Sequence, residues 1–259
     1  MTCSPPQLIC FSRWAGRVST ALIPAIPSLL LPALVAAAPP LTCSAQAEAK
    51  TTVVELYTSE GCSSCPPADR WLSTLKGQPD VIALAFHVNY WDRLGWPDRF
   101  ATAATTDRQR AVMAGSGSPY VYTPQVIVNG ADWRGWPKLP AAGGAAPMQT
   151  QKPAPTLALS RSGKVISAEV GPAAGSLSGY WALVEDGHAS NVRAGENRGE
   201  TLRHDHVVRR YEPIPAWVAD AARRLQWTVE EPAAAGRRVV FVLTPVGANL
   251  PLRAASLAC

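Results

Sequence analysis

The sequence predicts an α/β domain followed by a smaller β-rich domain. Three observations lead to this fold class. Residues 51–138 alternate strand-like and helix-like segments, which is typical of a sheet with crossover connections. Residues 139–155 are dominated by Ala, Gly, Pro and Gln, as in a linker. Residues 156–259 hold short strand-like runs separated by Gly and Pro turns, as in a sandwich.

The first domain opens with a strand and a short helix. Residues 52–57 are apolar and β-branched, which favours a strand. Pro66 and Pro67 follow shortly after, and adjacent prolines are tolerated in the first turn of a helix, where backbone donors lack partners. Trp71, Leu72 and Leu75 then recur at helical spacing, and Gly77 ends the helix.

Three further elements complete this domain. Residues 81–88 form a nearly continuous apolar run, as in a strand covered on both faces. Residues 98–113 have helical character and end before Gly115. Residues 120–128 read as a strand that Asn129-Gly130 turns into a hairpin.

In the second half of the chain the sequence predicts strands throughout, with one short helix at residues 220–224. The predicted strands are 156–160, 165–170, 180–185, 207–211, 225–230 and 239–243.

Composition and net charge exclude several classes of protein. The chain has 259 residues, of which 47% are hydrophobic and 17% charged, so it can bury a core and is not disordered. Its net charge of +5 is small and dispersed, which argues against a nucleic-acid-binding protein. No internal repeat is visible, so a solenoid is excluded.

Residues 1–47 are typical of an export signal. Two arginines precede an apolar stretch, and Ala45-Gln46-Ala47 offers small residues for cleavage; Ala36-Ala37-Ala38 is a second site, disfavoured by Pro39. An uncleaved membrane anchor is the alternative, although prolines interrupt the stretch. We therefore expect a periplasmic or secreted protein. Cleavage after Ala47 would leave a close cysteine pair and a single further thiol, Cys259.

The chemistry is expected at Cys62-Ser63-Ser64-Cys65. A Cys-x-x-Cys segment at the start of a helix brings two sulfurs within disulfide reach, and the positive end of the helix dipole favours a thiolate. Cys62 would be the nucleophile and Cys65 the resolving thiol. An inert structural disulfide is the alternative, and half of a zinc site is another, but no second Cys-x-x-Cys completes one.

Thr123 and Pro124 are the next candidate site residues. A proline that starts a strand near a disulfide is often cis, and it leaves neighbouring backbone groups free to pair with an incoming peptide. An ordinary edge-strand proline is the simpler interpretation.

These motifs resemble the thioredoxin fold and, more narrowly, an uncharacterised family of exported bacterial thioredoxin-like proteins. The resemblance lies in residues 54–69, 87–92, 123–125, 195–199 and 204–205. It implies a thioredoxin-like α/β domain followed by a sandwich-like domain, and an extracytoplasmic location. It also implies a buried acid beneath the active-site helix. Glu55, with a raised pKa, would then accept the proton of Cys65; an exposed edge carboxylate or an ion-pair partner of Arg70 is the alternative.

The histidines carry weaker hypotheses. His87 ends a predicted strand and could stabilise a thiolate or join a metal site, but a packing role is the simpler interpretation. His204 and His206 would share one face of a strand, as metal ligands do, although a hydrogen-bonded strand is again simpler.

The function predicted from the sequence is an extracytoplasmic thiol–disulfide oxidoreductase. Its partners would be exported thiol or disulfide proteins and a redox partner, with no nucleic acid, no cofactor and no resident metal. It would contact a membrane only if the signal stays uncleaved. Two alternatives remain: a copper-delivery protein that binds Cu(I) through Cys62, Cys65 and His87, and a binding module braced by a structural disulfide.

Overall fold

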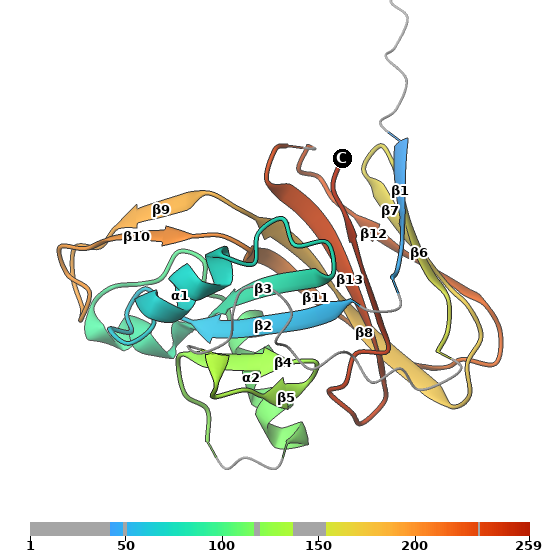
Figure 1. The fold of residues 1–259 in the computed structure, drawn as a ribbon, viewed down its shortest axis with the longest axis horizontal. Coiled ribbons are helices and arrows are strands. Elements are labelled where there is room, and N and C mark those ends of the chain that lie inside the picture. Colours follow the sequence, from blue (N-terminus) through green and yellow to red (C-terminus); the bar gives the residue numbers. More distant parts are fainter. Residues whose placement is uncertain (1–41, 49–50, 117–119, 137–153, 233) are drawn as a thin grey trace, which may run out of the picture. The chain divides into compact units, whose positions relative to one another are not determined.

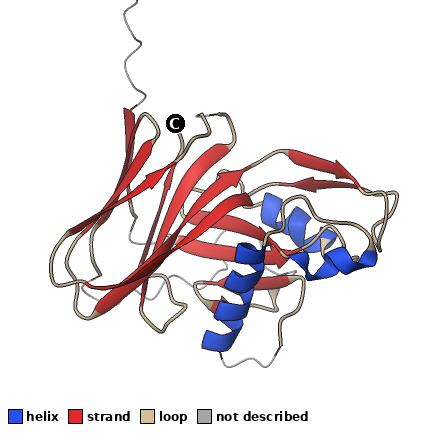
Figure 2. Cartoon of the chain, turned by 180° about the vertical axis from the view of Figure 1, so that it is seen from behind, coloured by secondary structure: helices blue, strands red, loops and turns tan. Residues whose placement is uncertain are grey.

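The computed structural model describes residues 42–48, 51–116, 120–136, 154–232 and 234–259 (Figure 1). These residues belong to one unit, which spans Pro39–Cys259. Strands are the commonest element among them and form sheets of eight, four and two strands. Figure 2 shows the helices gathered at one end of the strands. No helix in the described ranges is long and apolar enough to cross a membrane.

The first half of the chain contains the helices. Its elements are β1 (Thr42–Gln46), β2 (Thr52–Thr58), α1 (Pro66–Ser73), β3 (Val81–His87), the 3₁₀ helix η1 (Asn89–Leu94), α2 (Ala103–Gly115), β4 (Gln125–Val128) and β5 (Ala131–Asp132). The second half supplies β6 (Leu157–Ser162), β7 (Val165–Val170), β8 (Ser176–Glu185), β9 (His188–Asn191), β10 (Thr201–His204), β11 (Val207–Val218), β12 (Arg223–Thr228), β13 (Arg237–Pro245) and β14 (Arg253–Leu257).

The predicted fold class, a thioredoxin-like α/β domain followed by a separate β-rich domain, is wrong. Strands from both halves of the chain form one eight-stranded sheet in the order β14-β13-β8-β11-β3-β2-β4-β5. The junction lies between β11 and β3, which run parallel with Val207 opposite Ala85. An edge strand presents unpaired backbone groups. Here β11 covers the edge of β3, and the two halves become one mostly β structure.

Strand β8 explains why the halves cannot be separated. Its residues alternate between two hydrophobic cores, so that Leu177, Trp181 and Leu183 pack with residues from β6, β7 and β12. Tyr180 and Val184, on its other face, pack with residues from β2 and β3. A strand buried on both faces reads as a continuous apolar run, and residues 180–184 are such a run.

Several element boundaries differ from the sequence-based expectations. Helix α2 begins at Ala103 rather than at Asp98, because Thr102 caps it: its hydroxyl accepts from the Thr105 amide, and the Thr105 hydroxyl accepts from the Thr102 amide. The segment expected to form a short helix at 220–224 instead leads into β12, which begins at Arg223.

The N-terminal expectations are only partly covered by the described residues. Residues 1–41 of the predicted signal and 139–153 of the predicted linker lie outside them. Strand β1 pairs with β6, and Cys43 forms a disulfide with Cys259. Cys259 is therefore not a leftover thiol. Cleavage after Ala47 would remove Cys43 and β1, whereas cleavage at the second site, after Ala38, would keep both.

Candidate functional site

The cysteine pair lies between β2 and α1. Cys62 and Cys65 form a disulfide with their Cα atoms 5.4 Å apart. Cys65 is the N-cap of α1, and Pro66 and Pro67 occupy the first turn, as the sequence predicts. Both cysteines have an exposed fraction of 0%, so the sulfurs are reached only if a neighbouring segment moves.

The Thr123–Pro124 peptide bond is cis, and this loop contacts the disulfide. The Thr123 hydroxyl donates to Cys62 Sγ over 3.3 Å and accepts from the Trp91 indole over 2.8 Å. The Trp91 N–H donates a hydrogen bond to the Thr123 hydroxyl oxygen, and the hydroxyl's own hydrogen is then directed at the sulfur. Gly61 permits this packing, since a Cβ there would lie 3.0 Å from Trp91 Cβ.

A loop from the second half of the chain is hydrogen-bonded to the Cys-x-x-Cys segment. We call residues 192–200, between β9 and β10, the cover loop. The Asn197 amide donates to the carbonyl oxygens of Glu60 and Cys62, each over 2.9 Å. Glu196 accepts from the Ser63 hydroxyl over 2.7 Å and from its amide over 3.1 Å, and these bonds lower the pKa of Glu196. The cover loop is therefore held onto the Cys-x-x-Cys segment itself.

The expected position and pKa of Glu55 are both wrong. Val54 and Leu56 face α1, so Glu55, between them, points to the opposite face of the sheet. There it pairs with Arg108 over 2.8 Å and accepts from the Tyr180 hydroxyl over 2.7 Å. Burial raises the pKa of Glu55, but Arg108 and these hydrogen bonds outweigh it, so the net pKa is lowered. Glu55 thus contributes an ion pair to the core rather than a base beneath the cysteines.

Buried titratable side chains form a cluster that includes Glu60, just before the cysteine pair, and Asp69, just after it. His87 Nδ1 lies 2.6 Å from Asp98 Oδ2, and His204 Nε2 lies 3.4 Å from Glu60 Oε1. His204 Nδ1 faces Asp69 Oδ1 at 3.9 Å. We call Glu60, Asp69, His87, Asp98 and His204 the buried polar cluster.

The pKa values in this cluster follow from burial and pairing. Burial raises the pKa of Asp69. Burial alone would lower the pKa of His87, but the Asp98 carboxylate outweighs it and raises that pKa. In turn, the pKa of Asp98 is lowered: burial raises it, but His87 and the backbone amides of Glu60 and Phe100 outweigh burial.

The two histidines expected on one strand face do not share one. His204 ends β10 and joins the buried polar cluster, whereas His206 lies in the following turn with φ of 61°. His206 contacts Arg238, with 2.6 Å between His206 Nδ1 and the guanidinium. The Cu(I) set proposed from the sequence is also not assembled. Within the described residues, the group that converges closely enough to hold an ion is Asp69, His87 and His204, without either cysteine.

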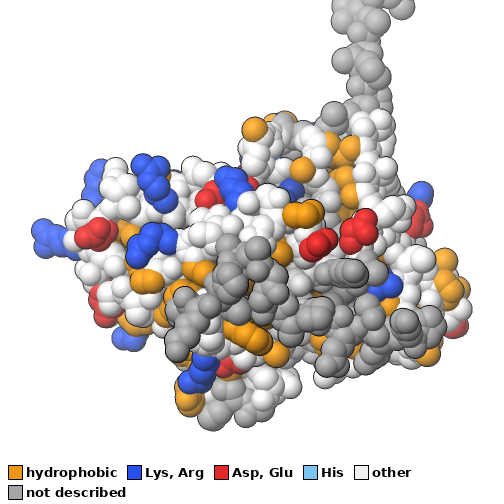
Figure 3. All heavy atoms as spheres, viewed as in Figure 1, with side chains coloured by type: hydrophobic (Ala, Val, Ile, Leu, Met, Phe, Trp, Pro, Cys, Tyr) orange, Lys and Arg blue, Asp and Glu red, His pale blue; other side chains and the backbone are white. Residues whose placement is uncertain are grey.

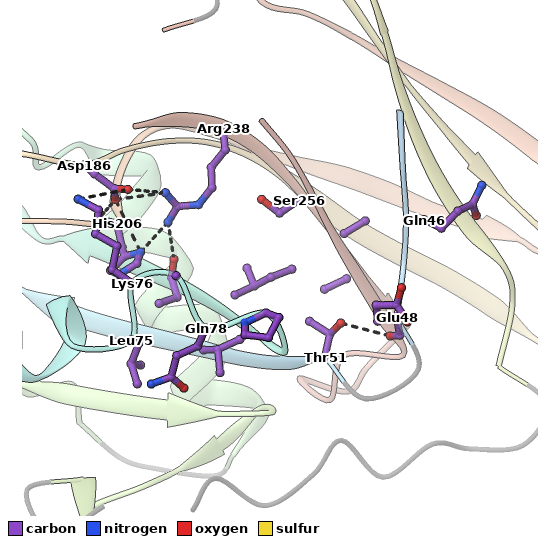
Figure 4. Close-up of a pocket in the computed structure, with 17 residues that line it drawn as sticks. Gln46, Glu48, Thr51, Leu75, Lys76, Gln78, Asp186, His206, Arg238 and Ser256 are labelled. Atoms are coloured by element: carbon purple, nitrogen blue, oxygen red, sulfur yellow. Dashed lines mark hydrogen bonds and ion pairs between the residues drawn. The ribbon is translucent and has the colours of Figure 1, made fainter. Parts of the chain in front are cut away.

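A pocket of about 300 Å³ lies beside His206 (Figure 4). Three of its charged side chains pair with one another: Asp186 accepts from Arg238 at 3.1 Å and lies 3.8 Å from Lys76. On the face shown in Figure 3, Lys and Arg side chains are frequent over the end that carries β9 and β10, with acidic side chains between them. The residues that line this pocket do not include Cys62 or Cys65.

Several residues of this site escape a sequence-based search. Glu60 and Asp69 flank the cysteines, and Asp69 follows Cys65 by four residues, which places it one helical turn further on. The Glu196–Asn197 pair lies within a segment that carries the family resemblance, and this was the available signal. Nothing local in the sequence connects Asp98 with His87, because their contact depends on the path of η1.

Comparisons with known proteins agree with this picture. Residues 53–243 match the family described as "Protein of unknown function (DUF1223)". The crystal structure of the protein AGR_C_4864 from Agrobacterium tumefaciens is similar at 27% identity with a TM-score of 0.62, covering 82% of this chain and 95% of that one.

HBP35 of Porphyromonas gingivalis shares the fold at a TM-score of 0.51 and 13% identity, covering 81% of this chain and 75% of that one. No curated protein matches the chain. Because the family match spans most of the described residues, including the cysteine pair, the cis-proline loop and the cover loop, the chain is a member of the DUF1223 family.

Proposed function

We propose that this protein is an extracytoplasmic thiol–disulfide oxidoreductase that exchanges its Cys62–Cys65 disulfide with exported protein substrates. The contact between the Thr123 hydroxyl and Cys62 Sγ carries the proposal. A hydroxyl that donates to a sulfur stabilises the thiolate over the thiol. Because the Trp91 indole donates to the same hydroxyl oxygen, this arrangement favours Cys62 as the reactive sulfur of the pair.

The exchange proceeds in two balanced steps. In the oxidising direction, a substrate thiolate attacks Cys62 Sγ, the Cys62–Cys65 bond breaks, and Cys65 leaves as a thiolate that takes up a proton. A second substrate thiolate then attacks the substrate sulfur of the mixed disulfide and displaces Cys62, so that the substrate is oxidised and the pair is reduced. The reducing direction runs through the same mixed disulfide in reverse.

Access requires the cover loop to open. The sulfurs are fully buried, and Asn197 and Glu196 hold the loop onto the segment that carries them. The two Asn197 attachments are hydrogen bonds between neutral groups, each worth roughly 0.5–1.5 kcal/mol. An opening of this modest cost is compatible with exchange and would protect the pair from nonspecific thiols.

The cysteine usage supports an oxidising compartment. The described residues contain two disulfides, Cys43–Cys259 and Cys62–Cys65. Disulfides form and persist in secreted and periplasmic proteins and are rare in the cytosol. The proposed partners are therefore exported proteins with thiols or disulfides and a redox partner that restores the cysteine pair, and no cofactor beyond the cysteines is needed.

The test is the reduction potential of the Cys62–Cys65 pair, measured by equilibration with glutathione and thiol alkylation. A value between about −120 and −270 mV, the range of known exchange catalysts, supports the proposal, and a value below about −300 mV indicates a structural disulfide. The variant Cys65→Ser should accumulate mixed disulfides with substrate proteins through Cys62. The variant Cys62→Ser is the matched control and should accumulate far fewer.

A further inference from the structure

Three side chains of the buried polar cluster converge on one point. Asp69 from α1, His87 from β3 and His204 from β10 each offer one ligand atom, and these atoms all lie within 4.8 Å of one another. Their exposed fractions are 6%, 0% and 2%. Three elements distant in sequence therefore bring two imidazoles and a carboxylate together in the interior.

The remaining two members of the cluster orient the imidazoles. Asp98 accepts from His87 Nδ1 at 2.6 Å, and Glu60 Oε1 lies 3.4 Å from His204 Nε2. An imidazole whose outer N–H points to a carboxylate presents the lone pair of its other nitrogen, and metal-bound histidines are held in this way. His87 Nε2 and His204 Nδ1 are buried and have no hydrogen-bond partner, and the contact between His204 Nε2 and Glu60 Oε1 is an ion-pair distance without hydrogen-bond geometry.

The charge of the cluster also calls for a cation. Glu60, Asp69 and Asp98 are buried carboxylates. Among the ion pairs of the described residues, their partners are His87 and His204, and no Lys or Arg pairs with them. Burying charge without compensation is costly. A bound cation, protonated imidazoles or a protonated carboxyl group can supply the compensation, and a cation satisfies the carboxylates and the imidazole nitrogens together.

We propose that Asp69, His87 and His204 bind one divalent transition-metal ion, with Zn²⁺ as the reference ion. Imidazole nitrogen and carboxylate oxygen suit this class of ion, and three protein ligands leave a coordination position open. A cavity of about 130 Å³, lined by Pro66, Asp69 and His204 among others, gives an ion a route to the ligands. Protonated imidazoles leave the two unpartnered nitrogens unexplained, because each would then need an acceptor.

The bound ion would clamp the β9–β10 hairpin to α1 and β3. His204 ends β10, whereas Asp69 belongs to α1, which follows the cysteine pair, and His87 ends β3. The cover loop connects β9 with β10, so an ion at this point would hold the loop's base. This inference does not depend on thiol exchange, because neither cysteine is a ligand.

The test is calorimetric titration of metal-free full-length protein with Zn²⁺, repeated with Co²⁺ to record the absorption spectrum of the bound ion. We expect one ion per chain and a higher Tm in its presence. The variant His204→Gln should lose stoichiometric binding, and Asp98→Asn should bind 10- to 100-fold more weakly, because it orients a ligand. His206→Gln, two residues away in a different cluster, is the matched control and should bind as wild type.

A double variant, Cys62→Ser with Cys65→Ser, separates this proposal from the proposed function, because it should still bind one Zn²⁺ while losing all thiol exchange. Asp69→Asn preserves the side-chain shape and serves if His204→Gln does not fold. The proposal is overturned if wild-type protein binds no stoichiometric ion, or if His204→Gln and Asp69→Asn bind as tightly as wild type. Nuclear magnetic resonance that finds both nitrogens of His87 protonated in the presence of Zn²⁺ would equally overturn it.

Discussion

The population of the open form of the cover loop should limit the rate at which the disulfide reacts. The variant Asn197→Ala should favour the open form and so raise that rate. The Asn197 side chain is buried and donates to the carbonyl oxygens of Glu60 and Cys62. Alanine removes both hydrogen bonds: the Glu60 carbonyl loses its side-chain partner in the closed form, and the Cys62 carbonyl keeps only the Cys65 amide. In the open form water satisfies these carbonyls, so the substitution destabilises the closed form selectively.

The magnitude follows from these two hydrogen bonds. Both are 2.9 Å long, and a hydrogen bond of this kind contributes a net free energy of roughly 0.5–1.5 kcal/mol. Losing both costs the closed form about 1–3 kcal/mol, which raises the open population roughly 5- to 150-fold. If reaction occurs from the open form, the rate should rise by the same factor.

The assay is the second-order rate of reduction of the Cys62–Cys65 disulfide by dithiothreitol, followed by alkylation and mass spectrometry. Asn191→Ala is the matched control. Asn191 is exposed at the end of β9 and accepts from the Thr201 hydroxyl over 2.9 Å, remote from the cysteines. We expect this variant to react at the wild-type rate.

Equal rates for wild type and Asn197→Ala would refute the reasoning and show that reagents reach the sulfurs without loop opening. Urea unfolding of both proteins separates local from global effects. A rate increase that merely matches a loss of global stability would also refute it, because the reactive form would then be the unfolded chain.

Three further predictions concern Glu55, Thr123 and the Cys43–Cys259 disulfide. Glu55→Gln should cost about 3–5 kcal/mol of unfolding free energy at neutral pH, because it breaks a buried ion pair, yet leave the exchange rate of the folded protein unchanged. Since the pKa of Glu55 is lowered on folding, its contribution is present above pH 4.5 and is lost as the pH falls through the lowered pKa, so urea titrations of both proteins should converge in acid. Thr123→Val should slow iodoacetamide alkylation of reduced Cys62 about tenfold at neutral pH, since a hydrogen bond to a charged group is worth roughly 1.5–3 kcal/mol; an unchanged rate would contradict the proposed role of the hydroxyl. Peptide mapping of the exported protein should recover Cys43 linked to Cys259, and Cys259→Ser should lower the unfolding free energy by about 2–5 kcal/mol; a mature N-terminus beyond Cys43 would exclude this disulfide.

Local patterns predict the cysteine site well. The strand, the paired prolines and the helix spacing around residues 52–75 place Cys62 and Cys65 at the start of α1, as the structure has them. Thr123 was found in the same way, from a proline at the start of a strand. These features depend on neighbours in sequence, and backbone propensity determines them.

Glu55 shows where such reasoning fails. Its strand was located correctly, but the face to which it points depends on what covers each side of the sheet. A residue's face is reversed by a shift of one position, and sequence alone does not say which face α1 takes. The packing of Val54 and Leu56 against α1 decides this, and it leaves Glu55 to Arg108.

The sequence by itself located α1, α2 and most of the strands, although not β1, β9, β10 or β14, and it indicated which cysteines form the close pair and which loop approaches them. Tertiary structure alone decided that both halves share one sheet, that Cys43 meets Cys259, and that the cover loop is bonded to the Cys-x-x-Cys segment. It also decided that Asp69, His87 and His204 converge. The physical reason is the range of the interactions. Turns, caps and periodicity act over a few residues, whereas edge pairing of β3 with β11 and packing of β8 against β2 join residues about 100 or more positions apart.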